Sequence, residues 1–280
     1  MDVISQSVTK GAGTAFARAA LNYAGSGDGR REVEVEISDG RATRLPGWEV
    51  CGFELIAHSS SVTDWHDDQE IATVHYAELE TLAQRLTGCH FALASDHVTR
   101  ATSARSGRDQ SPVMLVHSDF AANYEDVARA AYQGAHGRGA AALARRGRTA
   151  DDVAGAGRIL VMQFWRNLGA SRMDYPLAFC DCQTLTPEET RPFRYTGYVA
   201  GGRSFDALAV LAPPAPSAHA WYTFPDMTPG EVVAFRTYDT ELVDAGRTWF
   251  TPHSAFRDPG IEVGNPPRFS IEARVMCLFS

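Results

Sequence analysis

Three side chains in this sequence have the types and order needed to hold one metal ion. His117 and Asp119 stand two residues apart in the apolar segment VMLVHSDF. If this segment is a strand, alternation places both side chains on one face, where they can reach the same ion. His253 ends a later aromatic segment, RTWFTPH. Two imidazoles and one carboxylate on adjacent strands leave three coordination positions open on iron(II). We therefore predict His117, Asp119 and His253 as the metal ligands and the catalytic centre.

A second group of side chains, near the C-terminal end of the sequence, could bind a carboxylate. Arg268 and Ser270 form R-x-S in the segment PPRFSIEARV, 15 residues after His253. A guanidinium binds a carboxylate through two parallel hydrogen bonds, and a serine hydroxyl on the same strand face can add a third. Arg274 has the same parity but lies six residues beyond Arg268, about 20 Å along a strand. We favour Arg268 as the clamp and keep two alternatives, in which Arg274 is the clamp or one arginine binds substrate.

The order H-x-D, distant H, R-x-S resembles that of the Fe(II)/2-oxoglutarate-dependent dioxygenases. The segments MQFWRNL, DYPLAFCD, HAWYTFPDMTPGEVVAFRTYDT and HSAFRDP narrow the resemblance to a hydroxylase/desaturase subfamily. This subfamily includes relatives of the cephamycin C-7 hydroxylase component and fungal gibberellin-desaturase-like and endoperoxide-forming enzymes. The likeness covers roughly residues 90–280. It implies Fe(II), O2 and 2-oxoglutarate as cosubstrate, and a small-molecule secondary metabolite as substrate. It also implies oxidation of an unactivated C–H bond, by hydroxylation, desaturation or oxidative ring formation.

The resemblance also bears on individual positions around these motifs. It implies that Arg166 in WRNL and Tyr222 in WYTFPDM face the pocket and help to bind the cofactor. Two positions depart from the subfamily pattern, because Asn167 replaces a usual proline and Gln163 replaces a common asparagine. Related halogenases lack the carboxylate ligand, so the presence of Asp119 favours oxidation over halogenation.

The elements that must position these residues indicate a mainly β fold with flanking helices. From residue 91 onward, short apolar segments recur with turn residues between them, a pattern typical of sandwiches and barrels. An alanine-rich helical insertion is expected near residues 124–158. We interpret residues 1–280 as a single domain whose jelly-roll core, a cupin-like double-stranded β-helix, spans about 91–280.

The N-terminal part, about residues 1–90, is expected to pack on this core. The segment EVEVEIS at 32–38 alternates apolar and charged residues and predicts a strand. We predict a second strand at 48–57. An apolar stripe predicts a helix at 69–86, and Gly88 is a plausible end for it.

Composition limits the classes of partner. The chain has 34 acidic and 26 basic side chains and a formal charge of −8, which disfavours nucleic acid and anionic membranes. The sequence shows no signal peptide and no long apolar run, so we expect a cytoplasmic protein. The sequence leaves its oligomeric state and exact substrate open. Two other readings are a metal-dependent cupin enzyme that does not use 2-oxoglutarate, and a non-enzymatic jelly roll that binds ligands.

Overall fold

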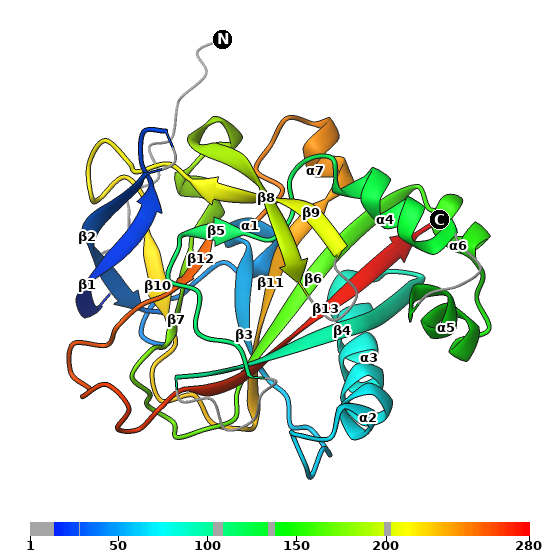
Figure 1. Ribbon diagram of the computed structural model, residues 1–280, viewed down its shortest axis with the longest axis horizontal. Coiled ribbons are helices and arrows are strands. Elements are labelled where there is room, and N and C mark those ends of the chain that lie inside the picture. The colour runs from blue at the N-terminus through cyan, green and yellow to red at the C-terminus, as the bar shows by residue number, and fades with distance from the viewer. Residues whose placement is uncertain (1–13, 28, 103–108, 134–137, 199–202) are drawn as a thin grey trace.

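Two β-sheets that face each other form the body of the protein (Figure 1). The computed structural model describes residues 14–27, 29–102, 109–133, 138–198 and 203–280. The larger sheet has, in spatial order, β1 (Ala15–Ala24), β2 (Arg30–Asp39), β10 (Trp221–Thr223), β7 (Leu177–Cys180), β12 (His253–Ala255), β5 (His117–Ser118), β9 (Arg203–Val210) and β8 (Thr190–Tyr198). The smaller sheet has β3 (Phe53–Ala57), β11 (Glu231–Asp239), β6 (Arg158–Asn167), β13 (Phe269–Phe279) and β4 (Phe91–Ala101). This arrangement confirms the predicted double-stranded β-helix.

The two sheets differ in how their strands are buried. In β2 the alternation read from the sequence is visible, because Val33, Val35 and Ile37 are buried while the residues between them are exposed. By contrast, β6 and β13 are buried along nearly their whole length, on both faces. One face of the smaller sheet packs on the larger sheet, and a helix covers the other.

The helix that covers the smaller sheet runs from Asp68 to Thr87 and confirms the prediction for 69–86. It consists of α2 (Asp68–Glu70), a π-helical turn (Ile71–His75) and α3 (Tyr76–Thr87). Gly88 ends it with a positive φ of 70°. Its apolar residues, including Leu79 and Leu82, pack with the odd-numbered residues of β13 in one cluster.

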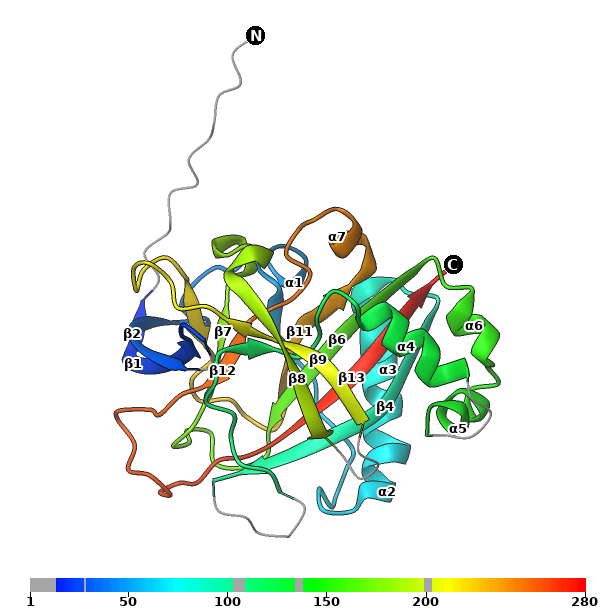
Figure 2. The same ribbon diagram turned by 45° about the horizontal axis from the view of Figure 1, so that its top comes forward.

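The predicted helical insertion is also present. It contains α4 (Tyr124–Gln133), α5 (Arg138–Arg145) and α6 (Ala150–Ala154), which lie together beside the end of β13 (Figure 2). Arg129 on α4 donates hydrogen bonds to the carbonyl groups of Val153 and Ala154 and so ties α4 to α6.

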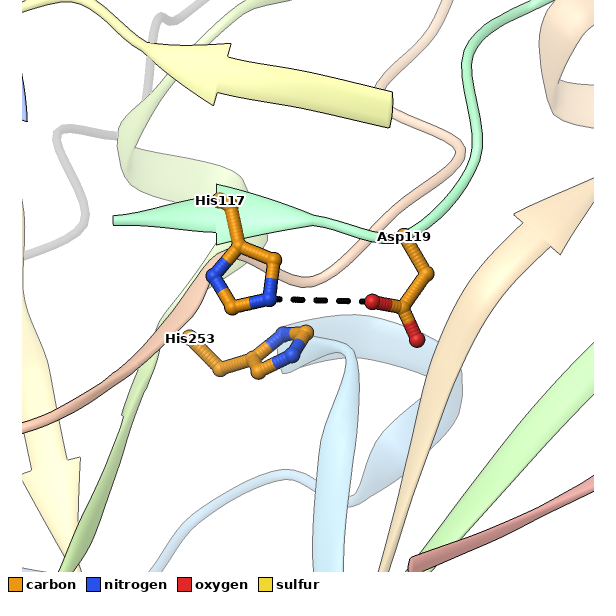
Figure 3. A group of neighbouring side chains, drawn as sticks. All are labelled: His117, Asp119 and His253. Atoms are coloured by element: carbon orange, nitrogen blue, oxygen red, sulfur yellow. Dashed lines mark ion pairs between the residues drawn. The ribbon is translucent and has the colours of Figure 1, made fainter. Parts of the chain in front are cut away.

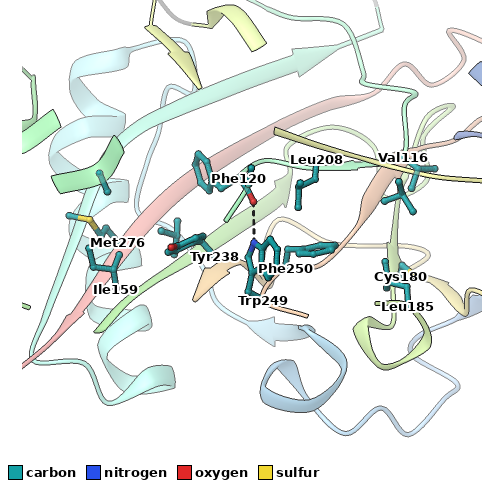
Figure 4. Packing of buried hydrophobic residues seen from close by; sticks show 14 of the residues in the cluster. Val116, Phe120, Ile159, Cys180, Leu185, Leu208, Tyr238, Trp249, Phe250 and Met276 are labelled. Carbon is teal, nitrogen blue, oxygen red and sulfur yellow. Dashed lines mark hydrogen bonds between the residues drawn. The ribbon is translucent and has the colours of Figure 1, made fainter. Parts of the chain in front are cut away.

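Aromatic and aliphatic side chains fill the space between the sheets (Figure 4). Even-numbered residues of β13, such as Met276 and Leu278, belong to this cluster. The indole N–H of Trp249 donates to the carbonyl group of Phe120, 3.3 Å away. The inner face of the smaller sheet is therefore the even-numbered face of β13, the face that carries Arg268, Ser270 and Arg274.

Two local predictions are wrong in extent. The segment 48–57 is not one strand, because Trp48–Cys51 forms the short helix α1 and only Phe53–Ala57 is extended. Gly47 and Gly52, with φ of 88° and 97°, bound this helix and turn the chain before the strand. The H-x-D segment is paired as a strand only at His117–Ser118, and Asp119 lies in the bend that follows.

Candidate metal centre and cosubstrate site

β5 and β12 bring the three predicted metal ligands together (Figure 3). His117 and His253 are directly opposite each other on these antiparallel strands, and their ring centroids lie 4.4 Å apart. Asp119 Oδ1 lies 3.7 Å from His117 Nε2. One ligand atom from each of the three residues falls within 4.8 Å of the other two. In the described part of the chain, no other three metal-ligating side chains converge in this way.

Both imidazoles are held in the tautomer that a metal requires. His117 Nδ1 lies 2.7 Å from the Leu115 carbonyl oxygen, and His253 Nδ1 lies 3.1 Å from that of Thr251. A carbonyl oxygen can only accept, so each Nδ1 carries the proton and each Nε2 keeps its lone pair for a ligand. Burial lowers the pKa of both rings, to about 4 for His253, where His117 adds to the effect. Both rings are therefore neutral near pH 7.

Asp119 is held as a carboxylate by a buried arginine. Arg274 donates to Asp119 Oδ2 from Nε at 2.9 Å and from Nη2 at 2.7 Å. Burial alone would raise the pKa of Asp119, but the positive charge and the hydrogen bonds of Arg274 outweigh it and lower that pKa. Arg274 binds only Oδ2 of Asp119, so Oδ1 remains free to face the two histidines.

The three ligand atoms are thus all electron-pair donors with no proton between them. Such a group repels itself unless a cation lies at its centre. Two neutral imidazoles and one carboxylate match the facial set that binds non-haem iron(II). The residues present therefore fit the ion that the motif predicts.

Arg268 and Ser270 form a second polar group on the same inner face. The Arg268 side chain is 1% exposed, and its Nε donates to Ser270 Oγ at 2.9 Å. Its Nη1 donates to the carbonyl group of Tyr175. Within the described residues, no carboxylate forms an ion pair with Arg268. Burial, reinforced by Arg100, lowers its pKa to about 9. A buried cation without a counter-ion is expensive, so a bound anion fits this position.

The two candidate clamps therefore differ in what they already bind. The charge of Arg274 is engaged by Asp119, and its Nη2 also lies 3.6 Å from Glu272. Arg268 has no such partner among the described residues. This contrast favours Arg268 as the carboxylate clamp and gives Arg274 a role in holding the metal ligand.

The two other predicted site residues, Arg166 and Tyr222, differ in where they lie. Arg166 is on the outer face of β6, so the expectation that it faces the pocket is wrong. Its guanidinium donates to the carbonyl groups of His58 and Pro229 and to His58 Nδ1, and it fastens two loops. Tyr222 is half-buried and is paired across the sheet with Phe179, which is itself paired with His253. Tyr222 therefore lies on the same face as His253 but two strands away, and its ring packs on Phe53.

Several buried polar residues of the inner face were not among the predicted site residues. Arg100 and Glu272 form an ion pair at 2.8 Å beside Arg274. Gln163 and Trp165 lie on β6, opposite Arg274 and Glu272 in the sheet register. The available signal was Gln163 itself, a single amide in the apolar segment ILVMQFW.

Comparison with known proteins places this chain in a family. A family model described as an oxidoreductase/YMDC permease-like domain matches residues 15–278. The hydroxylase/desaturase efuI of Hormonema carpetanum is 30% identical over 80% of this chain and 76% of that protein. The Fe(II)/2-oxoglutarate-dependent dioxygenase nvfI of Aspergillus novofumigatus is 25% identical over 72% of this chain and 65% of that protein.

The fold has a solved counterpart. The iron and α-ketoglutarate-dependent endoperoxidase NvfI superposes with a TM-score of 0.75 at 18% identity, and covers 95% of this chain and 98% of its own. The chain belongs to the Fe(II)/2-oxoglutarate-dependent oxygenases of the hydroxylase/desaturase type. The predicted cofactors of this class, Fe(II), 2-oxoglutarate and O2, are thereby confirmed. Among the described helices, none has the length and apolar character required to cross a lipid bilayer.

Proposed function

We propose that this enzyme oxidises an unactivated C–H bond of a small-molecule secondary metabolite, by hydroxylation, desaturation or oxidative ring formation. His117, Asp119 and His253 hold Fe(II), while Arg268 and Ser270 hold the distal carboxylate of 2-oxoglutarate. The names of the relatives, which include hydroxylase/desaturases and an endoperoxidase, support this range of reactions. The carboxylate ligand disfavours halogenation.

The residues of the chain bind the metal and 2-oxoglutarate, orient the metal ligands and exclude water from the site. Iron(II) in such a site supplies the reaction of O2 with 2-oxoglutarate, which yields succinate, CO2 and an oxidant able to remove hydrogen from carbon. Hydrogen bonds to the carbonyl groups of Leu115 and Thr251 orient the two imidazoles, and hydrogen bonds from Arg274 orient the Asp119 carboxylate. The Phe235 ring packs against the His253 ring, with 4.9 Å between their centroids, and places an apolar side chain beside this ligand.

One observation carries the proposal. The buried guanidinium of Arg268, which forms no ion pair with any described residue, lies on the sheet that faces three convergent side chains able to bind a metal. A keto diacid has one end for a metal and another for such a cation. A metal-dependent cupin that does not use 2-oxoglutarate leaves Arg268 unexplained, and a non-enzymatic jelly roll leaves the triad unexplained as well.

The test is an anaerobic titration of the Fe(II)-loaded protein with 2-oxoglutarate. We expect the weak visible charge-transfer band of the chelate, and succinate after air is admitted. His253→Ala should abolish the band by removing a ligand. Arg268→Met should weaken 2-oxoglutarate binding by at least tenfold, because a buried carboxylate would lose its counter-ion.

Arg158→Met is the matched control. It also removes a guanidinium from the smaller sheet, but one that pairs with Asp239 at 2.7 Å and takes no part in the site. The control should titrate like the wild type. A fully loaded wild-type protein that shows neither the band nor succinate contradicts the proposal.

A further inference from the structure

A buried network of polar side chains connects the larger sheet to the surface of the protein. Tyr23 on β1 and Trp221 on β10 are fully buried, and the indole N–H of Trp221 donates to Tyr23 Oη at 2.8 Å. His219 Nδ1 lies 3.3 Å from the same oxygen, and His219 Nε2 lies 3.3 Å from Oε1 of Glu189. The Glu189 side chain is 34% exposed. The network therefore runs from a buried phenol to a carboxylate in contact with solvent.

The direction of each hydrogen bond follows from the groups involved. A carboxylate can only accept, so Glu189 accepts from His219 Nε2–H. A neutral imidazole with its proton on Nε2 has a lone pair on Nδ1, and this nitrogen accepts the hydroxyl proton of Tyr23. The indole N–H of Trp221 can only donate, so it binds a lone pair of the phenol oxygen. Tyr23, His219 and Glu189 thus form a chain along which a proton can leave the phenol.

This network and the metal ligands lie on opposite faces of the larger sheet. Tyr222 pairs with Phe179 and Phe179 pairs with His253, so these three side chains share one face. Trp221 precedes Tyr222 on β10, and alternation along the strand turns its side chain to the other face. Tyr23 contacts Trp221 on that face.

Tyr23 is nevertheless close to the metal centre. The carbonyl group of the preceding residue, Asn22, accepts a hydrogen bond from the backbone N–H of Val116, and Val116 precedes His117. The phenol and the metal site are therefore separated by one sheet layer, roughly 10 Å. An electron can tunnel through folded protein over such a distance.

The surroundings of Tyr23 are suited to its one-electron oxidation. Burial raises the pKa of Tyr23, so the phenol keeps its proton in the resting protein. A phenol that loses an electron becomes a strong acid, so its oxidation is favourable only where a base accepts the proton at the same time. His219 Nδ1 is such a base, and Glu189 accepts the proton that His219 in turn releases.

We propose that Tyr23, His219 and Glu189 form a redox relay that reduces the oxidant of this enzyme when no organic substrate is bound. The oxidant formed from Fe(II), O2 and 2-oxoglutarate gains one electron, which Tyr23 loses. The phenolic proton passes to His219 Nδ1 and the Nε2 proton passes to the Glu189 carboxylate, which leaves a neutral tyrosyl radical. An external reductant such as ascorbate returns the electron, and the proton returns along the relay. This inference rests on the function proposed above, which supplies the oxidant.

The test exposes the Fe(II)-loaded protein to 2-oxoglutarate and O2 without an organic substrate, and samples are frozen for electron paramagnetic resonance. The wild type should form succinate and show a tyrosyl radical, whose spectrum narrows when ring-deuterated tyrosine is incorporated. Tyr23→Phe should lose this signal. His219→Gln should form the radical roughly a hundredfold more slowly, because a positioned base contributes at least that much to a proton transfer.

Glu189→Gln tests the exposed end of the relay, where a substitution leaves the core intact. Glutamine can accept the same hydrogen bond but cannot take up the proton, so the radical yield should fall severalfold at an unchanged melting temperature. Peptide mass spectrometry after prolonged turnover gives a second measurement. In Tyr23→Phe, hydroxylation of residues beside the metal ligands, such as Phe120 and Phe235, should accumulate earlier than in the wild type.

Tyr238→Phe is the matched control. Tyr238 is also buried, but its hydroxyl donates to the carbonyl group of Ala122 at 3.2 Å, and a carbonyl group is too weak a base to take up the proton. This variant should keep the radical signal and the oxidation pattern of the wild type.

Three outcomes overturn the inference. They are a wild type that forms succinate without a tyrosyl radical, a radical that persists in Tyr23→Phe or is lost in Tyr238→Phe, and a radical yield in Glu189→Gln equal to that of the wild type. A wild type that shows neither the charge-transfer band nor succinate refutes the proposed function and this inference together. The two failures are thereby distinguished.

Discussion

The ion pair between Arg274 and Asp119 gives the sharpest stability prediction. Both side chains are less than one tenth exposed, and Arg274→Met removes the cation while it keeps most of the aliphatic volume. Removing one partner of a buried ion pair costs about 3–5 kcal/mol, because the other charge is left buried alone. In a protein of this size 1 kcal/mol corresponds to roughly 2–4 °C, so the melting temperature of the metal-free protein should fall by roughly 10 °C.

The assay is urea and thermal unfolding of the metal-free protein in EDTA, repeated with Mn(II). A divalent ion gives Asp119 a new positive neighbour, so Mn(II) should restore part of the stability lost in Arg274→Met. Arg18→Met is the control for stability. Arg18 pairs with Glu34 at 3.4 Å, but the two side chains are 71% and 68% exposed. Its loss should cost no more than about 1 kcal/mol, because solvent screens the remaining charge.

The reasoning is refuted if Arg274→Met loses no more stability than Arg18→Met. The double variant Arg274→Met with Asp119→Asn provides a further check. It removes both charges, so it should be more stable than Arg274→Met alone. Additive losses would show that the two side chains are not energetically coupled.

Three further predictions concern metal, packing and pH. Mn(II) at one hundred times its dissociation constant should raise the free energy of unfolding of the wild type by about 2.7 kcal/mol, and should not stabilise His253→Ala, as urea titration would show. Gly52→Ala should lower both stability and Mn(II) affinity. Gly52 has a φ of 97°, and an added Cβ would collide with Oγ1 of Thr251, whose carbonyl group orients His253. Unchanged metal affinity would contradict this prediction. Burial, aided by Arg166, lowers the pKa of His75 to about 3, so below pH 6.5 the unfolded chain binds a proton that the folded protein does not. The free energy of unfolding should therefore decrease as the pH is lowered, and this residue alone should account for about 2 kcal/mol of the loss at pH 5. In His75→Gln the free energy of unfolding should change less between pH 7 and pH 5.

The metal ligands and the carboxylate clamp could be predicted from the sequence because most of these residues lie in short local motifs. H-x-D and R-x-S place two groups on one face of one segment, and only His253 had to be brought from a distance. The class of fold followed from recurrent short apolar segments. The helix at 69–86 followed from its apolar stripe, which a single packed face produces.

The errors have a physical origin in the burial of the smaller sheet. Because β6 is buried on both faces, alternation along it does not distinguish the face with Trp165 from the face with Arg166. The contact between Arg274 and Asp119 joins residues 155 positions apart, and no local pattern encodes it. The segment 48–57 has the composition of a strand, and its division into helix and strand depends on the positive φ of Gly52.

The predicted metal ligands belong to the larger sheet, whereas the proposed carboxylate clamp belongs to the smaller one. Neither sheet alone therefore carries a complete reaction centre, and the oxidising chemistry becomes available only after the two layers have closed on each other. A chain whose two layers have separated would therefore lack a site in which one 2-oxoglutarate molecule could reach both the metal and the arginine.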